Sequence, residues 1–167
     1  MTSLAYNDHD SLTTDAAGRV TNVLFATDRA VAPVLLRLVL AVVLFAHGAQ
    51  KAFGWFGGYG FEGTMSFFQS IGVPYVLGVL TIAIEVLGAA ALVAGSLTRP
   101  VAVGAIAIMA GAVAKIHGAN GFYMNWSGQQ AGEGYELHLL LAGIAASLLV
   151  TGAGRLSLDR LIARRSN

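Results

Sequence analysis

The feature that most constrains this chain is a series of apolar runs long enough to cross a lipid bilayer. The hydrocarbon core of a bilayer is about 30 Å thick, and a helix rising ~1.5 Å per residue needs roughly 20 apolar residues to cross it. We predict four such spans, at about residues 31–50, 75–95, 100–117 and 137–154. Lipid offers no partners to backbone N–H and C=O groups, and no run alternates like a strand, so each span is predicted to be a helix.

The composition supports the same environment. Hydrophobic residues make up 56% of the chain, charged residues only 11%, and the mean hydropathy is +0.67. Water-soluble domains of this length seldom have such values. The sequence therefore predicts an all-α integral membrane protein, a four-transmembrane-helix bundle. It contains no cysteine, which excludes disulfides, thiol catalysis and cysteine-ligated iron–sulfur clusters on this chain. Redox chemistry would need a bound molecule or a partner protein.

The arginines predict the orientation of the bundle. Apart from Arg37, they precede the first span, separate the second from the third, and follow the fourth, whereas the loops 51–74 and 118–136 contain none. Because positive residues collect on the cytoplasmic side, both termini are predicted to be cytoplasmic and the two aromatic-rich loops to lie outside. The chain then divides into a flexible acidic cytoplasmic tail at 1–29, a membrane domain at 30–155 and a basic cytoplasmic tail at 156–167.

Two charged residues lie deep within the predicted spans, away from the span ends. Glu85 is in the middle of the run "TIAIEVLGAAAL", and Arg37 is in the antiparallel first span. An isolated charge at the bilayer centre costs about 2.5–3.5 kcal/mol on insertion scales, so such groups usually pair. We predict a structural ion pair between Arg37 and Glu85. The alternatives are a protonated Glu85 hydrogen-bonded to Thr81 or a backbone carbonyl, with Arg37 reaching the headgroups, and a proton relay through Glu85.

Further polar residues cluster where the predicted spans end on the outer side, next to the aromatic loops. Those predicted to bind a ligand are His47, Lys51, Trp55, Lys115, His117, Glu136 and His138. The loop "FGWFGGYGF" and the segment "MSFFQSIG", a candidate short interfacial helix, are together expected to roof a pocket over these groups, with Glu136 orienting the lysines. Such a pocket suits a flat lipid-soluble headgroup, with a histidine or lysine donating a hydrogen bond to one of its carbonyl oxygens. The histidines come from three helices without a short ligand motif, so no metal is expected.

Several motifs, taken in order, resemble a known family. They are an arginine early in the first span, "HGAQKAFG" at its end, a glutamate within the second span, "GSLTRP" at the next turn, "GYEL" opening the fourth span and "GAGRLSLD" closing it. Together they resemble the DoxX family of small four-span bacterial membrane proteins, over about Val31 to Leu161. The resemblance implies a four-helix bundle in the bacterial cytoplasmic membrane. Some relatives are subunits of thiosulfate:quinone oxidoreductase or associate with other redox enzymes.

These observations predict a redox-associated membrane protein, a quinone-interacting subunit of a membrane oxidoreductase complex. Its expected partners are the lipid bilayer and either a redox protein or further copies of the chain, with no nucleic acid. Two alternatives remain. One is a non-enzymatic structural or assembly subunit that recruits partners to the membrane. The other is a small transporter that uses Glu85 for coupled proton movement.

Overall fold

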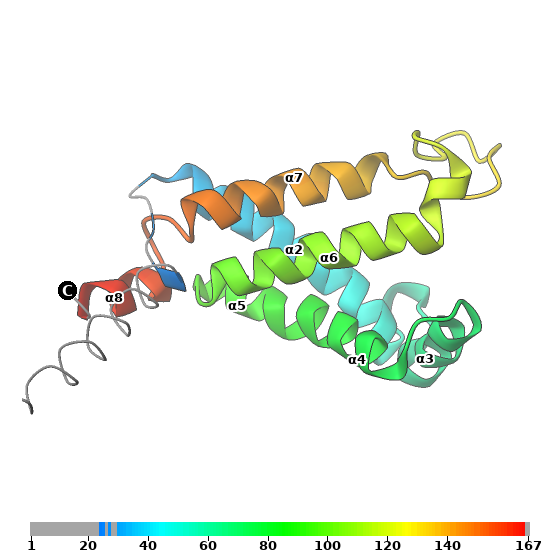
Figure 1. The fold of residues 1–167 in the computed structure, drawn as a ribbon, viewed down its shortest axis with the longest axis horizontal. Coiled ribbons are helices and arrows are strands. Elements are labelled where there is room, and N and C mark those ends of the chain that lie inside the picture. Colours follow the sequence, from blue (N-terminus) through cyan, green and yellow to red (C-terminus); the bar gives the residue numbers. More distant parts are fainter. Residues whose placement is uncertain (1–23, 26, 28–29, 166–167) are drawn as a thin grey trace, which may run out of the picture.

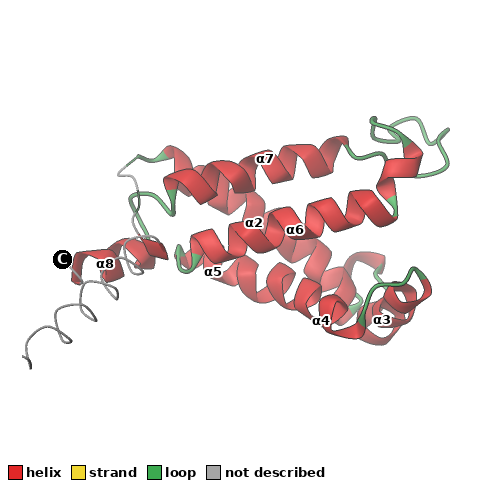
Figure 2. Cartoon of the chain, viewed as in Figure 1, coloured by secondary structure: helices red, strands yellow, loops and turns green. Residues whose placement is uncertain are grey.

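The computed structural model describes residues 24–25, 27 and 30–165, and the side chains of these residues up to Arg164. Nearly all of the predicted acidic tail, 1–29, lies outside the described residues. Within them every regular element is a helix and no strand occurs (Figure 2). The prediction of an all-α chain is therefore confirmed for the described part.

Four apolar rods, each a single helix or a series of joined helical segments, form the bundle (Figure 1). They are α2 (Ala32–Phe53), the joined segments α4 (Tyr75–Ala83), η2 (Ile84–Gly88) and α5 (Ala89–Ala94), then α6 (Thr98–Lys115) and α7 (Glu136–Thr151). The first three rods are long and apolar enough to cross a membrane, whereas α7 is apolar but shorter. The rods begin and end within a few residues of the four predicted spans.

The two ends of the bundle differ. At one end lie η1 (Trp55–Gly57), α3 (Gly60–Ser70), η3 (His117–Asn120) and the loop 121–135, and we call this the loop end. At the other lie the turn after α5 and the helix α8 (Leu158–Arg165), and we call this the terminal end. Residues 156–167, predicted as a basic tail, thus include a helix packed on the bundle, because its Asp159 is almost fully buried.

Small residues bring the rods close together. The buried core consists of leucines such as Leu40 and Leu148 interleaved with alanines such as Ala102 and Ala145. A Cβ atom at Gly48 of α2 would lie only 2.8 Å from the Cβ of Glu85, so a larger residue does not fit there without a shift. Such packing is typical of helices that associate in lipid, where close backbone approach replaces the hydrophobic driving force. Many outward side chains are apolar and suited to contact lipid.

Arg37 and Asp159 tie the terminal end together. Arg37 is 3% exposed. Its Nη1 donates to the carbonyls of Leu92 and Val93 at 2.7 and 2.8 Å, and its Nη2 donates to the carbonyl of Leu156. The first two carbonyls belong to the last turn of α5, where intrahelical donors run out.

Asp159 supplies the complementary cap. Its carboxylate accepts from the backbone N–H groups of Leu97 and Thr98, at 2.7 and 3.0 Å, where α6 begins. A carboxylate at a helix N-terminus satisfies unpaired donors and interacts favourably with the helix dipole. The two buried charges therefore fix the sharp turn between α5 and α6 and attach α8 to it.

We expect Arg37→Gln to lower the free energy of unfolding by about 2–4 kcal/mol, because it leaves buried carbonyls without a charged donor. The measurement is thermal or denaturant unfolding in detergent. Arg155→Gln is the matched control, since Arg155 is exposed and its side chain makes no hydrogen bond in the described structure. Equal losses in the two variants would contradict a structural role for Arg37.

Candidate functional site

A cavity of about 590 Å³ opens into the loop end of the bundle, between α2, α3, α4, α6 and α7. Most of its wall is apolar, with Phe67 and Phe68 from α3, Leu77 from α4 and Ile108 from α6. The charged and imidazole side chains in its lining are His47, Lys51, Glu85, Lys115, His117, Glu133 and His138. Every predicted binding residue except Trp55 and Glu136 therefore lines one cavity.

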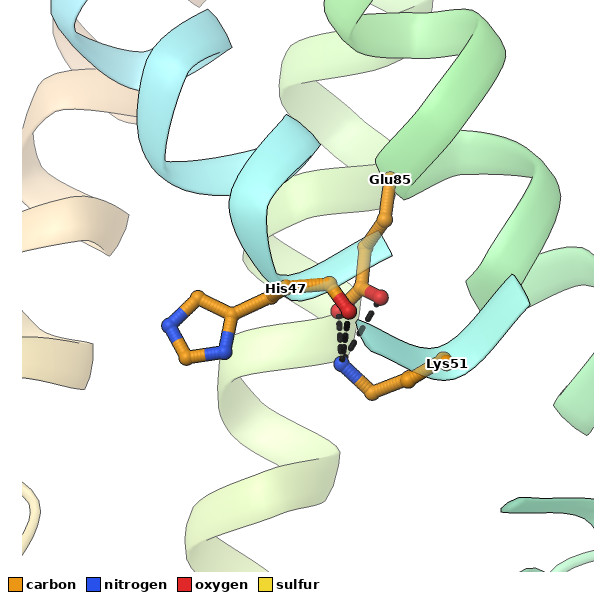
Figure 3. Close-up of polar contacts among 3 residues, drawn as sticks. All are labelled: His47, Lys51 and Glu85. Carbon is orange, nitrogen blue, oxygen red and sulfur yellow. Dashed lines mark hydrogen bonds and ion pairs between the residues drawn. The ribbon is translucent and has the colours of Figure 1, made fainter. Parts of the chain in front are cut away.

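The most buried polar side chain in the cavity lining, Glu85, forms an ion pair with Lys51 (Figure 3). The Lys51 Nζ lies 2.8 Å from each carboxylate oxygen of Glu85, and 3.4 Å from the backbone carbonyl of His47. The Glu85 side chain is 3% exposed, whereas that of Lys51 is 24% exposed. The carboxylate is thus enclosed, and the ammonium group is the partner that a ligand can reach.

The predicted ion pair between Arg37 and Glu85 is wrong. Glu85 lies beside Gly48 of α2, because a Cβ added to Gly48 would be only 2.8 Å from the Cβ of Glu85. Lys51 is one turn beyond Gly48, whereas Arg37 lies 14 residues before Lys51, or about 21 Å along the helix. Glu85 therefore reaches Lys51, and Arg37 is left to the carbonyls at the terminal end. The prediction misjudged the axial offset between the two helices.

A π-helical turn positions the Glu85 carboxylate. The segment η2 (Ile84–Gly88) is a single π turn between the α-helical segments α4 and α5. Such turns are rare and occur often at functional sites, because the extra residue changes the direction of nearby side chains. No sequence signal that we used indicates this turn. The small residue Gly48, within the motif "HGAQKAFG", is the sequence feature that permits the close approach of α2 and η2.

Two histidines stack in the cavity wall. The rings of His117 and His138 have centroids 4.1 Å apart and are tilted by 38°. The Nδ1 of His117 lies 2.8 Å from the carbonyl of Glu133, so that nitrogen is engaged. The Nδ1 of His138 is buried and has no hydrogen-bond partner among the described residues. His138 lines the cavity through its other atoms, since its Nδ1 is closed to solvent. Within the described part, no group of three His, Asp or Glu residues is arranged to hold a metal ion.

Trp55 and Glu136 lie outside the cavity lining. Trp55 is half exposed and packs against Phe53, with ring centroids 5.3 Å apart. The aromatic wall is formed instead by Phe67 and Phe68 of α3, within the segment "MSFFQSIG" that was expected to help roof the pocket. Glu136 accepts from the backbone N–H of Met124 at 3.2 Å and forms no ion pair with either lysine. The carboxylate that lies beside a lysine is therefore that of Glu85, whereas the sequence analysis had assigned this role to Glu136.

The remaining cationic residue, Lys115, lies at the rim of the cavity. Its side chain is exposed, and its Nζ donates to the carbonyl of Ile71 at 3.4 Å. This long contact joins the end of α6 to the segment between α3 and α4. Lys115 and Lys51 thus occupy different levels of the same cavity, one at the rim and the other beside the buried carboxylate.

Comparison with known proteins gives the following matches. The family model described as DoxX matches residues 32–118. The protein "Putative oxidoreductase CatD" of Bacillus subtilis strain 168 is 31% identical over 128 residues, which cover 77% of this chain and 84% of that protein. "Inner membrane protein YphA" of Escherichia coli strain K12 is 28% identical over 141 residues, which cover 81% of this chain and 94% of that protein. No solved structure matches significantly.

Lys51→Met should lower the free energy of unfolding by about 3–5 kcal/mol, because it leaves the buried Glu85 carboxylate without its counter-charge. The double variant Lys51→Met/Glu85→Gln should recover a large part of that loss, since no net charge stays buried. Unfolding of both single variants and the double variant in detergent measures the coupling. Lys115→Met is the control, with an expected loss below about 1 kcal/mol. If the loss in the double variant equals the sum of the two single losses to within about 0.5 kcal/mol, the two residues do not interact and the ion pair is contradicted.

Proposed function

The chain belongs to the DoxX family of membrane proteins, and on that premise we propose that it is a quinone-interacting subunit of a membrane oxidoreductase complex. The observation that carries the proposal is the ion pair of Lys51 and Glu85 in the lining of a largely apolar cavity. Burying such a pair is costly, and replacing it with packed apolar residues is often neutral or stabilising. Its presence beside a cavity therefore favours a role in ligand binding.

The cavity suits an uncharged flat ring with two carbonyl oxygens. Its volume of about 590 Å³ lies within the roughly 300–1,000 Å³ of small-molecule sites. Phe67 and Phe68 offer apolar contact to the faces of a ring. An ammonium group has three N–H donors. In Lys51 two of them bind Glu85 and the third makes only the long contact to His47, so it is available to a carbonyl oxygen.

The lining groups also suit the chemistry of reduction. Converting a quinone to a quinol takes two electrons and two protons, and negative charge accumulates on the ring oxygens as electrons arrive. A hydrogen bond from Lys51 strengthens as that charge grows, while Glu85 holds the ammonium group in place. We assign the supply of protons to the imidazoles of His117 and His138 in the wall. The electrons come from a partner oxidoreductase, in line with the name of the Bacillus subtilis relative.

We further propose that all four rods cross the bacterial cell membrane with both termini in the cytoplasm. The terminal end carries Arg99, Arg155, Arg160 and Arg164, whereas the loop end carries no arginine. This asymmetry supports the orientation through the positive-inside rule. The 16 residues of α7 extend about 24 Å, which spans most of the hydrocarbon core. The name of the Escherichia coli relative, an inner membrane protein, supports the proposed location in the cell membrane.

Quinone binding tests the function. In nanodiscs, wild type should bind a decyl-tailed benzoquinone saturably, and the folded double variant Lys51→Met/Glu85→Gln should bind it at least about tenfold more weakly, or 1.4 kcal/mol. The reason is the loss of a charged hydrogen-bond donor. Glu62→Gln, an exposed site on α3 outside the cavity lining, should leave the dissociation constant unchanged. Wild type that binds no quinone, even with its natural redox partner, would contradict the proposal and favour an assembly subunit.

Single cysteines test the orientation, because the chain has none of its own. Ser127→Cys at the loop end should react with a membrane-impermeant maleimide in intact cells. Arg155→Cys at the terminal end should react only after the membrane is permeabilised. Both positions are exposed, so accessibility alone does not separate them. Labelling of Arg155→Cys but not of Ser127→Cys in intact cells would reverse the proposed topology.

A further inference from the structure

The cavity has a side opening between α4 and α6. The second rod and α6 pack tightly in the middle of the bundle, where a Cβ at Gly104 would lie 2.8 Å from Ile84 Cδ1. Toward the loop end the two helices diverge, as Figure 1 shows, and α6 packs against α5 and η2 rather than extensively against α4. A Cβ at Gly111 would meet no atom within 4 Å. Gly111 nevertheless lines the cavity.

Residues on both sides of this gap line the cavity, and one on each helix is also exposed. On α4 they are Leu77 and Thr81, and on α6 they are Ile108, Gly111 and Ala112. Leu77 is 53% exposed, and Gly111 is exposed as well. Because cavity-lining residues on both helices are exposed where α4 and α6 diverge, we infer that the cavity opens sideways between them.

The opening lies at the depth of lipid tails. Its inner limit is the contact of Gly104 with Ile84, and its outer limit is the bond from Lys115 to the carbonyl of Ile71. From Gly104 to Lys115 the α6 axis extends about 16 Å. This stretch belongs to an apolar helix long enough to cross a membrane. Its flanking residues carry no charge short of the rim at Lys115, so the gap is suited to a hydrocarbon chain and not to water.

We propose that the natural ligand is an amphiphile dissolved in the bilayer, whose polar head lies at Lys51 and whose hydrocarbon tail leaves the cavity between α4 and α6. The identity of the head rests on the proposed quinone function, and the side opening specifies the rest of the molecule. The ligand is then a long-tailed, polyprenyl-type quinone that enters from the lipid phase. Entry from lipid follows because transfer of a hydrocarbon tail through water is strongly unfavourable.

A tryptophan at the opening tests this route. Gly111→Trp places a large side chain in the open space between α4 and α6. Gly143→Trp is the matched control, because Gly143 is an exposed helical glycine of α7, also has no atom within 4 Å of a Cβ, and is not part of the cavity lining. The probes are 2,3-dimethoxy-5-methyl-1,4-benzoquinone, which has no tail, and its decyl-tailed analogue. Dissociation constants are measured in nanodiscs of one lipid composition, after thermal unfolding has confirmed that each variant is folded.

Gly111→Trp should weaken binding of the decyl-tailed quinone at least about tenfold while changing that of the tail-free quinone less than about twofold. Gly143→Trp should change neither. An unaltered affinity of Gly111→Trp for the tailed probe, or an equal loss for both probes, would overturn the side opening as the tail route. Failure of wild type to bind either probe would instead overturn the quinone function on which the inference rests.

A second measurement uses wild type alone and does not depend on the folding of a variant. A quinone with a diazirine on its tail should, on irradiation, attach to α4 around Leu77 and to α6 around Ile108 and Gly111, as located by mass spectrometry of the digested protein. Attachment confined to α3 or to the loop 121–135 would place the tail at the loop end and overturn the proposal.

Discussion

The candidate site depends on one interaction, the ion pair of Lys51 with Glu85. A carboxylate enclosed among apolar helices is tolerated only with a counter-charge at hydrogen-bond distance. Lys51 provides that counter-charge, because its Nζ lies 2.8 Å from each oxygen of the Glu85 carboxylate. The pair in turn requires the close approach of α2 and η2 at Gly48. The contact at Gly48, the π turn and the buried carboxylate are thus parts of one arrangement. The cavity is lined by Lys51, the more exposed partner of the ion pair.

The bundle divides its polar groups between two tasks. At the terminal end, Arg37 and Asp159 are buried and bound to backbone groups of the turn between α5 and α6, so their hydrogen bonds close that end. At the loop end, the polar groups line a cavity, and the buried Nδ1 of His138 has no partner among the described residues. The buried charges of the terminal end thus bind backbone groups and stabilise the fold, whereas the polar groups of the loop end line a cavity that a ligand can enter.

The divergence of α4 and α6 explains how a small bundle holds a cavity at all. Four rods packed closely along their whole length would leave no internal space, because small residues let their backbones meet. Here the close packing ends near Gly104, and beyond it α3 adds Phe67 and Phe68 to the cavity wall. The cavity is therefore walled by helices, one of them aromatic and at the loop end, and the proposed side opening would face lipid.

The sequence by itself determined the helical class, the four apolar segments and the gathering of His47, Lys51, Lys115, His117 and His138 at one end, because run length and position along a span are one-dimensional properties. Only the tertiary structure decided which charges meet. The partner of Glu85 depends on the axial offset of two helices, and that offset is set by the contact at Gly48 and by a π turn that no periodicity reveals. The same holds for Trp55 and Glu136, which share the level of the cavity but face away from it, because rotation about a helix or loop axis is fixed by packing and not by spacing.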